Sequence, residues 1–305
     1  MTDPTRGFPD RSSLPGFFGP AYPLGSNPSF ADLLRAASSG PEPSPSSAGQ
    51  KDPAVQPHQI AHGTTILALK FADGVVMAGD RRAVEGFTIA DERIDKVFPA
   101  DETSAVAIAG AAGQATEIVR LFQTELEHYE KVEGDRLSVE GKANRLAQMI
   151  RQNFPMALQG LVVVPLFAGF DERRGEGRLF RYDATGGRWE ETDFHATGSG
   201  ALSARSTLKK RFRTGMDRSG AVRTAVEALY DASQEDVATG GPNPLRGIFP
   251  TVKTITVDGV VAVPDEELRG AFESVLQETQ EPPRPQGGSQ PRGRPVKRED
   301  DKARG

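Results

Sequence analysis

The sequence predicts an α+β layer fold, in which two antiparallel sheets pack face to face and helix pairs cover their outer faces. Two observations lead to this prediction. Strand patterns come in hairpin groups and helical patterns come in pairs, an order that βαβ winding would not give. Proline marks the folded part, since eleven of the 23 prolines lie in residues 1–63 and five in 280–305.

The two ends of the chain differ from its middle in composition. Segments such as GPEPSPSSAGQKDP and EPPRPQGGSQPRGRP carry too little apolar surface to offset the entropy of ordering. We therefore expect residues 1–63, here called the leader, and residues 280–305, the tail, to be disordered. Residues 64–279 then form one folded domain.

Hydrophobic periodicity predicts the elements of this domain in order. Strands are expected at 64–70, 75–81, 92–98 and 103–109, and helices with one apolar face at 114–130 and 139–154. Strands return at 161–169, 178–183 and 189–195. Two further helices are expected at about 200–213 and at 219–234, the second capped by Ser219. A hairpin around Asp258-Gly259 and a helix at 265–277 complete the domain.

Composition excludes several classes of protein. The 305-residue chain has no cysteine, which removes disulfides, thiolate catalysis and cysteine zinc sites. A net charge of −5 offers no basic field for nucleic acid or anionic lipid. No apolar run approaches the ~18 residues of a membrane span, and the N-terminus lacks a secretory-signal pattern. We expect a cytoplasmic protein that needs no metal or cofactor and binds neither nucleic acid nor membrane.

Histidine offers no obvious catalytic base. Of the four histidines, two lie in the leader or at its edge, and a solvated or structural role is expected for His128 and His195. No histidine pair has metal-binding spacing. The GSG at 198–200 is not the G-x-S-x-G turn of serine hydrolases. A Ser-His-Asp site is therefore poorly supported.

The end of the leader suggests a different base. The leader stops at Gly63, and Thr64 opens the first strand. A cut between them would give Thr64 a free α-amine, with a reference pKa near ~8, beside its own hydroxyl. Threonine activated by its own amine is a known nucleophile. The alternative is that Thr64 and Thr65 are merely β-branched strand formers.

Two charged residues favour the nucleophile hypothesis. The turn at 73–74 folds the second strand back along the first and brings Asp80 close to Thr64. Strand alternation in RIDKVF puts Lys96 on an inward face between apolar neighbours, where an ammonium needs a partner such as Asp80. Its charge would lower the pKa of both the Thr64 amine and hydroxyl. A structural Asp80–Lys96 ion pair, or a lysine that reaches solvent, is the alternative.

These residues resemble a known family. TTILALKFADGVVMAGDRRA and RIDKVF are similar to the catalytic β subunits of 20S proteasomes, threonine peptidases of the N-terminal nucleophile hydrolase superfamily. AIAGAAGQA (107–115), ATGSG (196–200) and EDVATGG (235–241) match in the expected order, so the resemblance covers about 64–270. The leader, ELEHYEKVEG and VEALYDASQED look most like the actinobacterial type. The resemblance implies a four-layer αββα sandwich.

The resemblance also implies a role for each matching residue. Thr64 would be the nucleophile with its amine as base, and Asp80 and Lys96 would complete the charge network. Gly110 would present its N–H to the oxyanion. The remaining catalytic positions would hold the amine and its water, and they are Ser199, Asp236 and Thr239.

Two of these assignments leave questions open. The family usually has serine where this chain has Thr239, which adds a methyl group to the hydroxyl. Helix capping is the alternative for Ser199 and Asp236.

The expected substrate pocket has mostly apolar walls, which suggest cleavage after apolar residues, although Arg82 beside it leaves this open. The pocket residues are Ala83, Val84, Ala90, Ile94, Ile108 and Ala112.

Family members stack two β rings between α rings, with active sites inside the chamber. The expected partners are therefore proteasome α subunits and other β subunits in stacked heptameric rings, together with a ring ATPase and substrates carrying a ubiquitin-like tag. The leader would be a propeptide that Thr64 removes by cutting after Gly63. Three alternatives remain: a non-catalytic ring subunit, an amidase of the same superfamily, and an HslV-type peptidase, which lacks a long leader and the D-x-x-x-G-G segment at Asp236.

Overall fold

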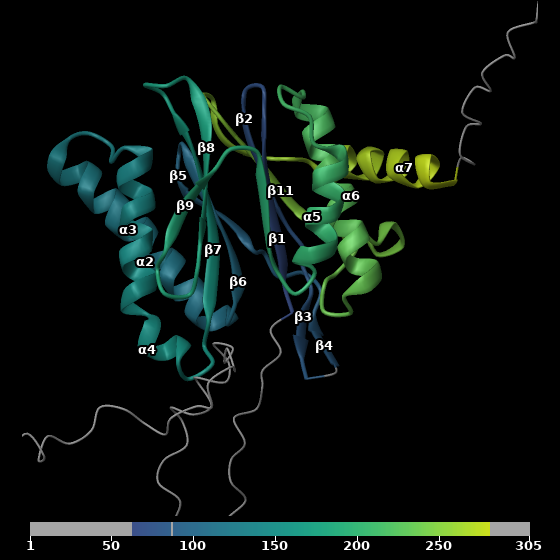
Figure 1. The fold of residues 1–305 in the computed structure, drawn as a ribbon, viewed down its shortest axis with the longest axis horizontal. Helices are drawn as coiled ribbons and strands as arrows, with labels where there is room; N and C mark the ends of the chain where they lie inside the picture. The colour runs from purple at the N-terminus through teal and green to yellow at the C-terminus, as the bar shows by residue number, and fades with distance from the viewer. Residues whose placement is uncertain (1–62, 87, 281–305) are drawn as a thin grey trace, which may run out of the picture. The chain divides into compact units, whose positions relative to one another are not determined.

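The computed structural model describes residues 63–86 and 88–280, and they form an αββα sandwich (Figure 1). Two five-stranded sheets pack face to face, and helices cover the outer face of each. The predicted α+β class and the four-layer order are confirmed. The predicted disordered leader and tail lie outside the described residues, apart from their innermost residues, Gly63 and Gln280.

Both sheets are antiparallel throughout. The first sheet has the order β10-β1-β2-β11-β12, with β1 (Thr65–Phe71), β2 (Gly74–Gly79), β10 (Phe194–Gly198), β11 (Thr251–Thr256) and β12 (Gly259–Ala262). The second sheet has the order β5-β6-β7-β8-β9, with β5 (Val97–Asp101), β6 (Ser104–Gly110), β7 (Val163–Asp171), β8 (Glu176–Tyr182) and β9 (Arg188–Glu191). A separate small hairpin pairs β3 (Ala83–Glu85) with β4 (Thr88–Asp91).

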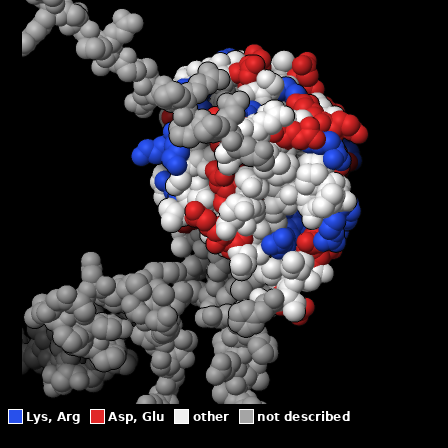
Figure 2. Space-filling view, turned by 90° about the vertical axis from the view of Figure 1, so that its right-hand side faces the viewer, with Lys and Arg blue, Asp and Glu red and all other residues white. Residues whose placement is uncertain are grey.

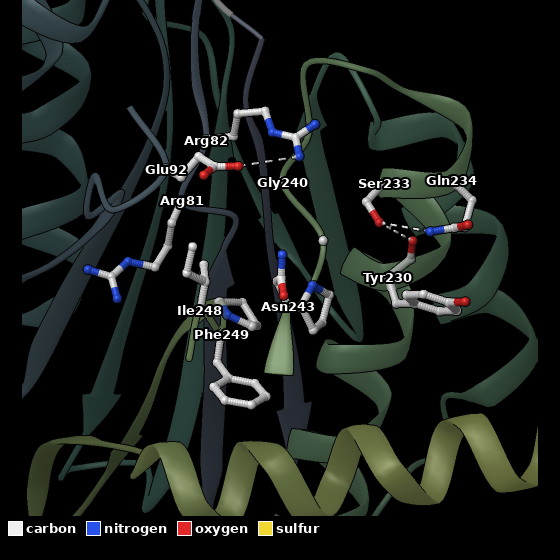
Figure 3. A pocket seen from close by; sticks show the side chains of 13 residues that line it. Arg81, Arg82, Glu92, Tyr230, Ser233, Gln234, Gly240, Asn243, Ile248 and Phe249 are labelled. Atoms are coloured by element: carbon white, nitrogen blue, oxygen red, sulfur yellow. Dashed lines mark hydrogen bonds and ion pairs between the residues drawn. The ribbon is translucent and has the colours of Figure 1, made fainter. Parts of the chain in front are cut away.

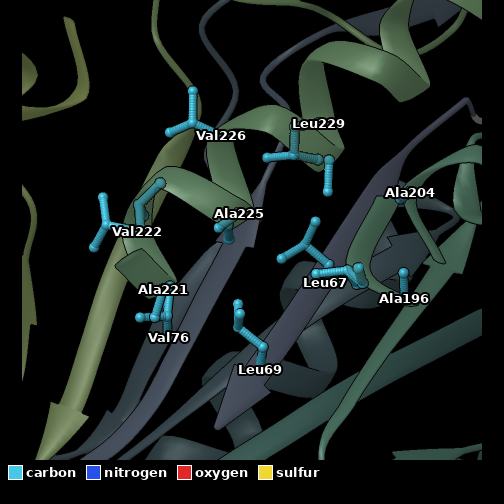
Figure 4. Close-up of a cluster of buried hydrophobic side chains, with 14 of the residues drawn as sticks. Leu67, Leu69, Val76, Ala196, Ala204, Ala221, Val222, Ala225, Val226 and Leu229 are labelled. Atoms are coloured by element: carbon cyan, nitrogen blue, oxygen red, sulfur yellow. The ribbon is translucent and has the colours of Figure 1, made fainter. Parts of the chain in front are cut away.

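Strand alternation in β1 explains how the layers join. Leu67 and Leu69 point to the helix side, where they meet apolar residues of helix α6 (Arg218–Glu235) such as Leu229 (Figure 4). Ile66 and Ala68 point the other way, into the buried layer between the sheets. The first sheet is covered by α5 (Ala201–Arg211), α6 (Arg218–Glu235) and α7 (Asp265–Gln280), and the second by α2 (Ala112–Glu133) and α3 (Val139–Gln152). Two short helices, α4 (Phe154–Ala157) and η2 (Pro244–Arg246), complete the described elements.

Two predicted strands differ from the structure. The run at 92–98 is a strand only from Val97 onward, because the polar stretch before it follows the β3–β4 hairpin and lies outside the sheet. This hairpin was not predicted. The run at 189–195 is two strands, β9 and β10, which belong to different sheets. The predicted run therefore spans the point where the chain crosses from one sheet to the other.

The predicted cap of α6 was also wrong. Asp217, not Ser219, caps this helix, since its carboxylate accepts from the N–H of Gly220 and the helix begins at Arg218. An aspartate three residues before an N–H has the reach that this bond requires, whereas Ser219 already lies inside the first turn.

The face formed by the helices of the first sheet carries both signs of charge around an uncharged area (Figure 2). Ion pairs tie α7 to its neighbours on this side, as between Arg218 and Glu267 at 2.5 Å and between Arg211 and Glu278 at 2.7 Å. Exposed pairs of this kind add little stability. Among the described helices, none has the length and apolar character required to cross a membrane.

Candidate active site

Thr64 lies immediately before β1, where the first sheet meets the loop that starts α5. Thr64 is buried, with 6% of the residue exposed. Its backbone N–H donates to Ser199 Oγ at 3.2 Å, and its carbonyl accepts from the Ser199 N–H at 2.9 Å. Its hydroxyl donates to the carbonyl of Gly63 at 2.7 Å. Thr64 is therefore held between Ser199 and the peptide bond that precedes it.

Asp80 is the hub of the site, at the end of β2. It is fully buried and accepts four hydrogen bonds. Oδ1 accepts from the Lys96 ammonium at 2.7 Å and from the Thr65 N–H at 2.8 Å. Oδ2 accepts from the N–H groups of Arg82 and Gly240, both at 2.9 Å. One carboxylate thus joins its own segment to three others, at Thr65, Lys96 and Gly240.

Lys96 is buried as predicted, although it lies one residue before the start of β5 and not within a strand. Only 5% of the residue is exposed, and its ammonium donates to Asp80 and, at 2.6 Å, to the Arg82 carbonyl. Burial lowers the pKa of Lys96 below its ordinary value, while the charge of Asp80 opposes this effect. The predicted partner is therefore present, and the alternative of a lysine that reaches solvent does not hold.

A second carboxylate anchors the other side of Thr64. Asp236 follows the end of α6, and its Oδ2 accepts from Ser199 Oγ at 2.5 Å and from Thr239 Oγ1 at 2.6 Å. Ser199 does not cap α5, because Gly200 occupies its N-cap position. Asp236 is the C-cap residue of α6 through its backbone N–H, which donates to the Ala232 carbonyl, and this leaves its side chain free to bind Ser199 and Thr239. Thr239 keeps the hydroxyl contact expected of a serine.

Gly110 ends β6 with φ of +115°, a conformation that side chains rarely adopt. A Cβ atom there would lie 2.0 Å from the carbonyl oxygen of Val162. Only glycine therefore fits, and its backbone lines the same pocket as Thr64.

Most of the residues predicted to line the substrate pocket do line this pocket. Its walls include five of the six, and Ala115 and Thr116 of α2 add to them. Ala90 is exposed on β4 and outside this lining, so its role stays a prediction. The predicted residues that do line the pocket are Ala83, Val84, Ile94, Ile108 and Ala112.

The guanidinium of Arg82 points away from the Thr64 pocket, toward Val237 and Glu92. It donates to the Val237 carbonyl at 2.8 Å and lies 4.0 Å from the Glu92 carboxylate. There it borders a second, more polar pocket with Tyr230 and Asn243 (Figure 3). The backbone of Arg82 faces Lys96 and Asp80, so its charge is held away from the apolar pocket walls.

Two observations fall outside the predicted set. Thr65 is fully buried, and its hydroxyl lies 2.6 Å from that of Thr239. Its only signal in the sequence is its position beside Thr64, because a threonine is common in strands. Within residues 63–86 and 88–280, no three His, Cys, Asp or Glu side chains cluster as a metal site.

Comparisons with known proteins agree with this geometry. Residues 60–243 match the family described as "Proteasome subunit". Over 210 residues the chain is 63% identical to "Proteasome subunit beta" of Acidimicrobium ferrooxidans, covering 69% of this chain and 77% of that protein. Over 225 residues it is 56% identical to "Proteasome subunit beta" of Acidothermus cellulolyticus, covering 72% and 78% respectively. The chain therefore belongs to the proteasome subunit family, among relatives named beta subunits.

Proposed function

We propose that this chain is a catalytic β subunit of a 20S proteasome core particle, a threonine endopeptidase that frees its own nucleophile. The observation that carries the proposal is the Asp80–Lys96 pair at 2.7 Å, because Lys96 lines the same pocket as Thr64. Burying a charge pair costs desolvation free energy. Buried charges of this kind cluster at functional sites, so a pair beside a hydroxyl supports a catalytic role. Peptide-bond hydrolysis by a terminal threonine needs such a charge.

The first reaction is removal of the leader. Thr64 Oγ1 already contacts the Gly63 carbonyl at 2.7 Å, so the nucleophile lies against the bond to be cut. Oγ1 attacks the Gly63 carbonyl carbon, the C–N bond to Thr64 breaks, and the hydroxyl proton ends on the departing nitrogen. Water then hydrolyses the resulting ester, which releases the Gly63 carboxylate and restores the hydroxyl beside a free α-amine.

The same residues then cleave substrates. The Thr64 amine takes the hydroxyl proton as Oγ1 attacks the substrate carbonyl, and the Gly110 N–H donates to the developing oxyanion. The proton passes to the leaving nitrogen, and water hydrolyses the acyl ester with the amine as base. The ammonium of Lys96 favours the neutral amine and the ionised hydroxyl. Ser199 and Asp236 hold the amine in line.

The pocket supports cleavage after apolar residues. Its side walls are aliphatic at Ala83, Val84 and Ile108, and the guanidinium of Arg82 is bound elsewhere by Val237 and Glu92. An apolar side chain can therefore enter without desolvating a charge.

The partners follow from the family. We infer stacked heptameric rings with α subunits and other β subunits, a ring ATPase, and unfolded or tagged protein substrates in the cytoplasm. A leader that keeps the Thr64 nitrogen as an amide leaves the subunit without a base until it is cut. This supports activation inside an assembled chamber.

The test measures the intact mass of the mature chain and the peptidase activity of particles assembled from the full chain. Active particles should contain chains that begin at Thr64, cleave a chymotryptic fluorogenic peptide and react with a threonine-directed inhibitor. Thr64→Ala is the matched control and should assemble, keep the leader and cleave nothing. Particles that neither cleave nor react would support a structural ring subunit instead. Small-amide hydrolysis without casein degradation would favour the amidase alternative, while the names of the relatives favour a proteasome β subunit over the HslV type.

A further inference from the structure

A continuous chain of hydrogen bonds runs behind Thr64 and involves a residue with no role in the mechanism above. The Gly200 N–H donates to Thr65 Oγ1 at 3.0 Å, and Thr65 Oγ1 lies 2.6 Å from Thr239 Oγ1. Thr239 Oγ1 in turn lies 2.6 Å from Asp236 Oδ2. Thr65 and Thr239 are both 0% exposed, so solvent does not complete these contacts.

The direction of this chain is fixed by counting protons. An ionised carboxylate only accepts, so Thr239 must give its single hydroxyl proton to Asp236. The hydroxyl proton between the two threonines therefore comes from Thr65, and the Gly200 N–H supplies the bond that Thr65 accepts. Each donor in such a chain strengthens the next, because donation polarises the following hydroxyl.

The chain ends at the nitrogen of the nucleophile. Asp236 Oδ2 also accepts from Ser199 Oγ at 2.5 Å, so the Ser199 hydroxyl is left to accept from the Thr64 nitrogen at 3.2 Å. The charge and position of one oxygen, Oδ2, thus decide how firmly Ser199 holds that nitrogen. The backbone N–H of Thr65 donates to Asp80, so this residue is linked to Asp80 directly and to Asp236 through the Thr239 hydroxyl.

We propose that Thr65 is a positioning residue, whose hydroxyl acts through Thr239 to fix the Asp236 carboxylate that holds Ser199 against the Thr64 nitrogen. The proposal rests on the proposed function, since the nitrogen acts as a base only once it is a free amine. A purely structural hydroxyl would contribute to folding and leave the chemistry of the amine unchanged.

The test uses Thr65→Val, which keeps the shape and removes the hydroxyl, and Thr65→Ser, which keeps the hydroxyl. Rates of peptide hydrolysis are measured from pH 5 to 9 on assembled particles and normalised to mature chains by intact mass. For Thr65→Val we expect kcat to fall about tenfold with little change in KM. Without the Thr65 hydroxyl, weaker hydrogen bonding to Asp236 leaves more negative charge on its carboxylate, which raises the pKa of the Thr64 amine. The acid limb of the pH–rate profile should therefore move up by about half a pH unit. Thr65→Ser should restore both.

The matched control is Thr254→Val, because Thr254 is a buried threonine of the same sheet, 3% exposed, whose hydroxyl donates to the Val261 carbonyl. This variant should lose some stability and keep the wild-type pH profile. A Thr65→Val profile equal to that of the control would overturn the proposal. If Thr65→Val does not assemble, Thr65→Cys replaces it, since a thiol is a weak donor, and a wild-type profile would again overturn the role. Failure of the wild type to cleave peptide would instead refute the proposed function itself.

Discussion

Two buried lysines in this chain allow the role of Lys96 to be separated from its contribution to stability. Lys96 pairs with Asp80 at 2.7 Å beside Thr64, and Lys142 pairs with Asp101 at 2.6 Å on the far side of the second sheet. They are 5% and 2% exposed respectively. We predict that Lys96→Ala and Lys142→Ala lose similar stability and differ in activity.

The expected stability loss follows from what each aspartate retains. Removing one partner of a buried ion pair typically costs about 3–5 kcal/mol, because the remaining charge is uncompensated. Asp80 keeps three backbone N–H donors in Lys96→Ala, so we expect the lower end, about 3 kcal/mol. Asp101 keeps donors from Thr103 and Ser104 in Lys142→Ala, so a similar loss of about 3 kcal/mol is expected.

The expected activities differ because only Lys96 lies in the pocket of Thr64. Loss of the positive charge should reduce peptide hydrolysis by about 10²–10⁴-fold, the range for proton-transfer catalysis. To avoid an effect on leader removal, both variants are made with the leader replaced by a tag whose cleavage leaves Thr64 first. Thermal unfolding and fluorogenic peptide turnover are then measured on assembled particles.

The comparison has a clear refuting result. If Lys96→Ala and Lys142→Ala lose activity to the same extent at matched stability, Lys96 acts only as half of a structural pair. Normal turnover in Lys96→Ala would refute its assigned role directly.

Three further predictions follow from single sites. Thr64→Ala removes the attacking oxygen, so we expect assembly with an intact leader and no peptide cleavage, read by intact mass and turnover. Gly63→Ala would place its Cβ 1.7 Å from the Cβ of Ala238, so leader removal should slow strongly in a processing time course. Burial lowers the pKa of His195 to about 4, from the ordinary 6.5, helped by the charges of Arg205 and Arg181. The unfolded chain therefore binds more protons between these values, and stability falls as pH falls from 6.5 to 4; His195→Gln should lose less over this range in urea unfolding.

The chemistry of the site was easier to predict than its backbone. The alternation that placed Lys96 on an inward face assumed a strand from 92, yet the strand begins at Val97. The prediction of burial survived because it depended on apolar neighbours and on the need of an ammonium for a carboxylate, and Asp80 supplies that carboxylate at 2.7 Å. Charge pairing is thus less sensitive to local geometry than a strand boundary.

Other features could not be read from the sequence because they depend on side-chain directions set by distant segments. The direction of the Arg82 side chain depends on the Val237 carbonyl, which lies far along the chain, and on Glu92 beyond the β3–β4 hairpin. The sequence did not show that Ala90 lies on a small hairpin, where it is exposed and outside the lining of the Thr64 pocket. Thr65 gave the signal of an ordinary strand residue, and only its 2.6 Å contact with Thr239 distinguishes it.

In the uncut chain, the contacts around the Thr64 nitrogen already match those needed by the free amine that would act as the base. The Thr64 nitrogen already donates to Ser199 at 3.2 Å while it is still an amide. Ser199 is held by Asp236, and the Thr64 carbonyl is held by the Ser199 N–H at 2.9 Å. Cleavage after Gly63 would then change the chemistry of one atom and leave its neighbours in place. Preorganised groups of this kind need little reorganisation during reaction, so peptide cleavage should begin as soon as the leader departs. A long lag between the two in a processing time course would contradict this reasoning.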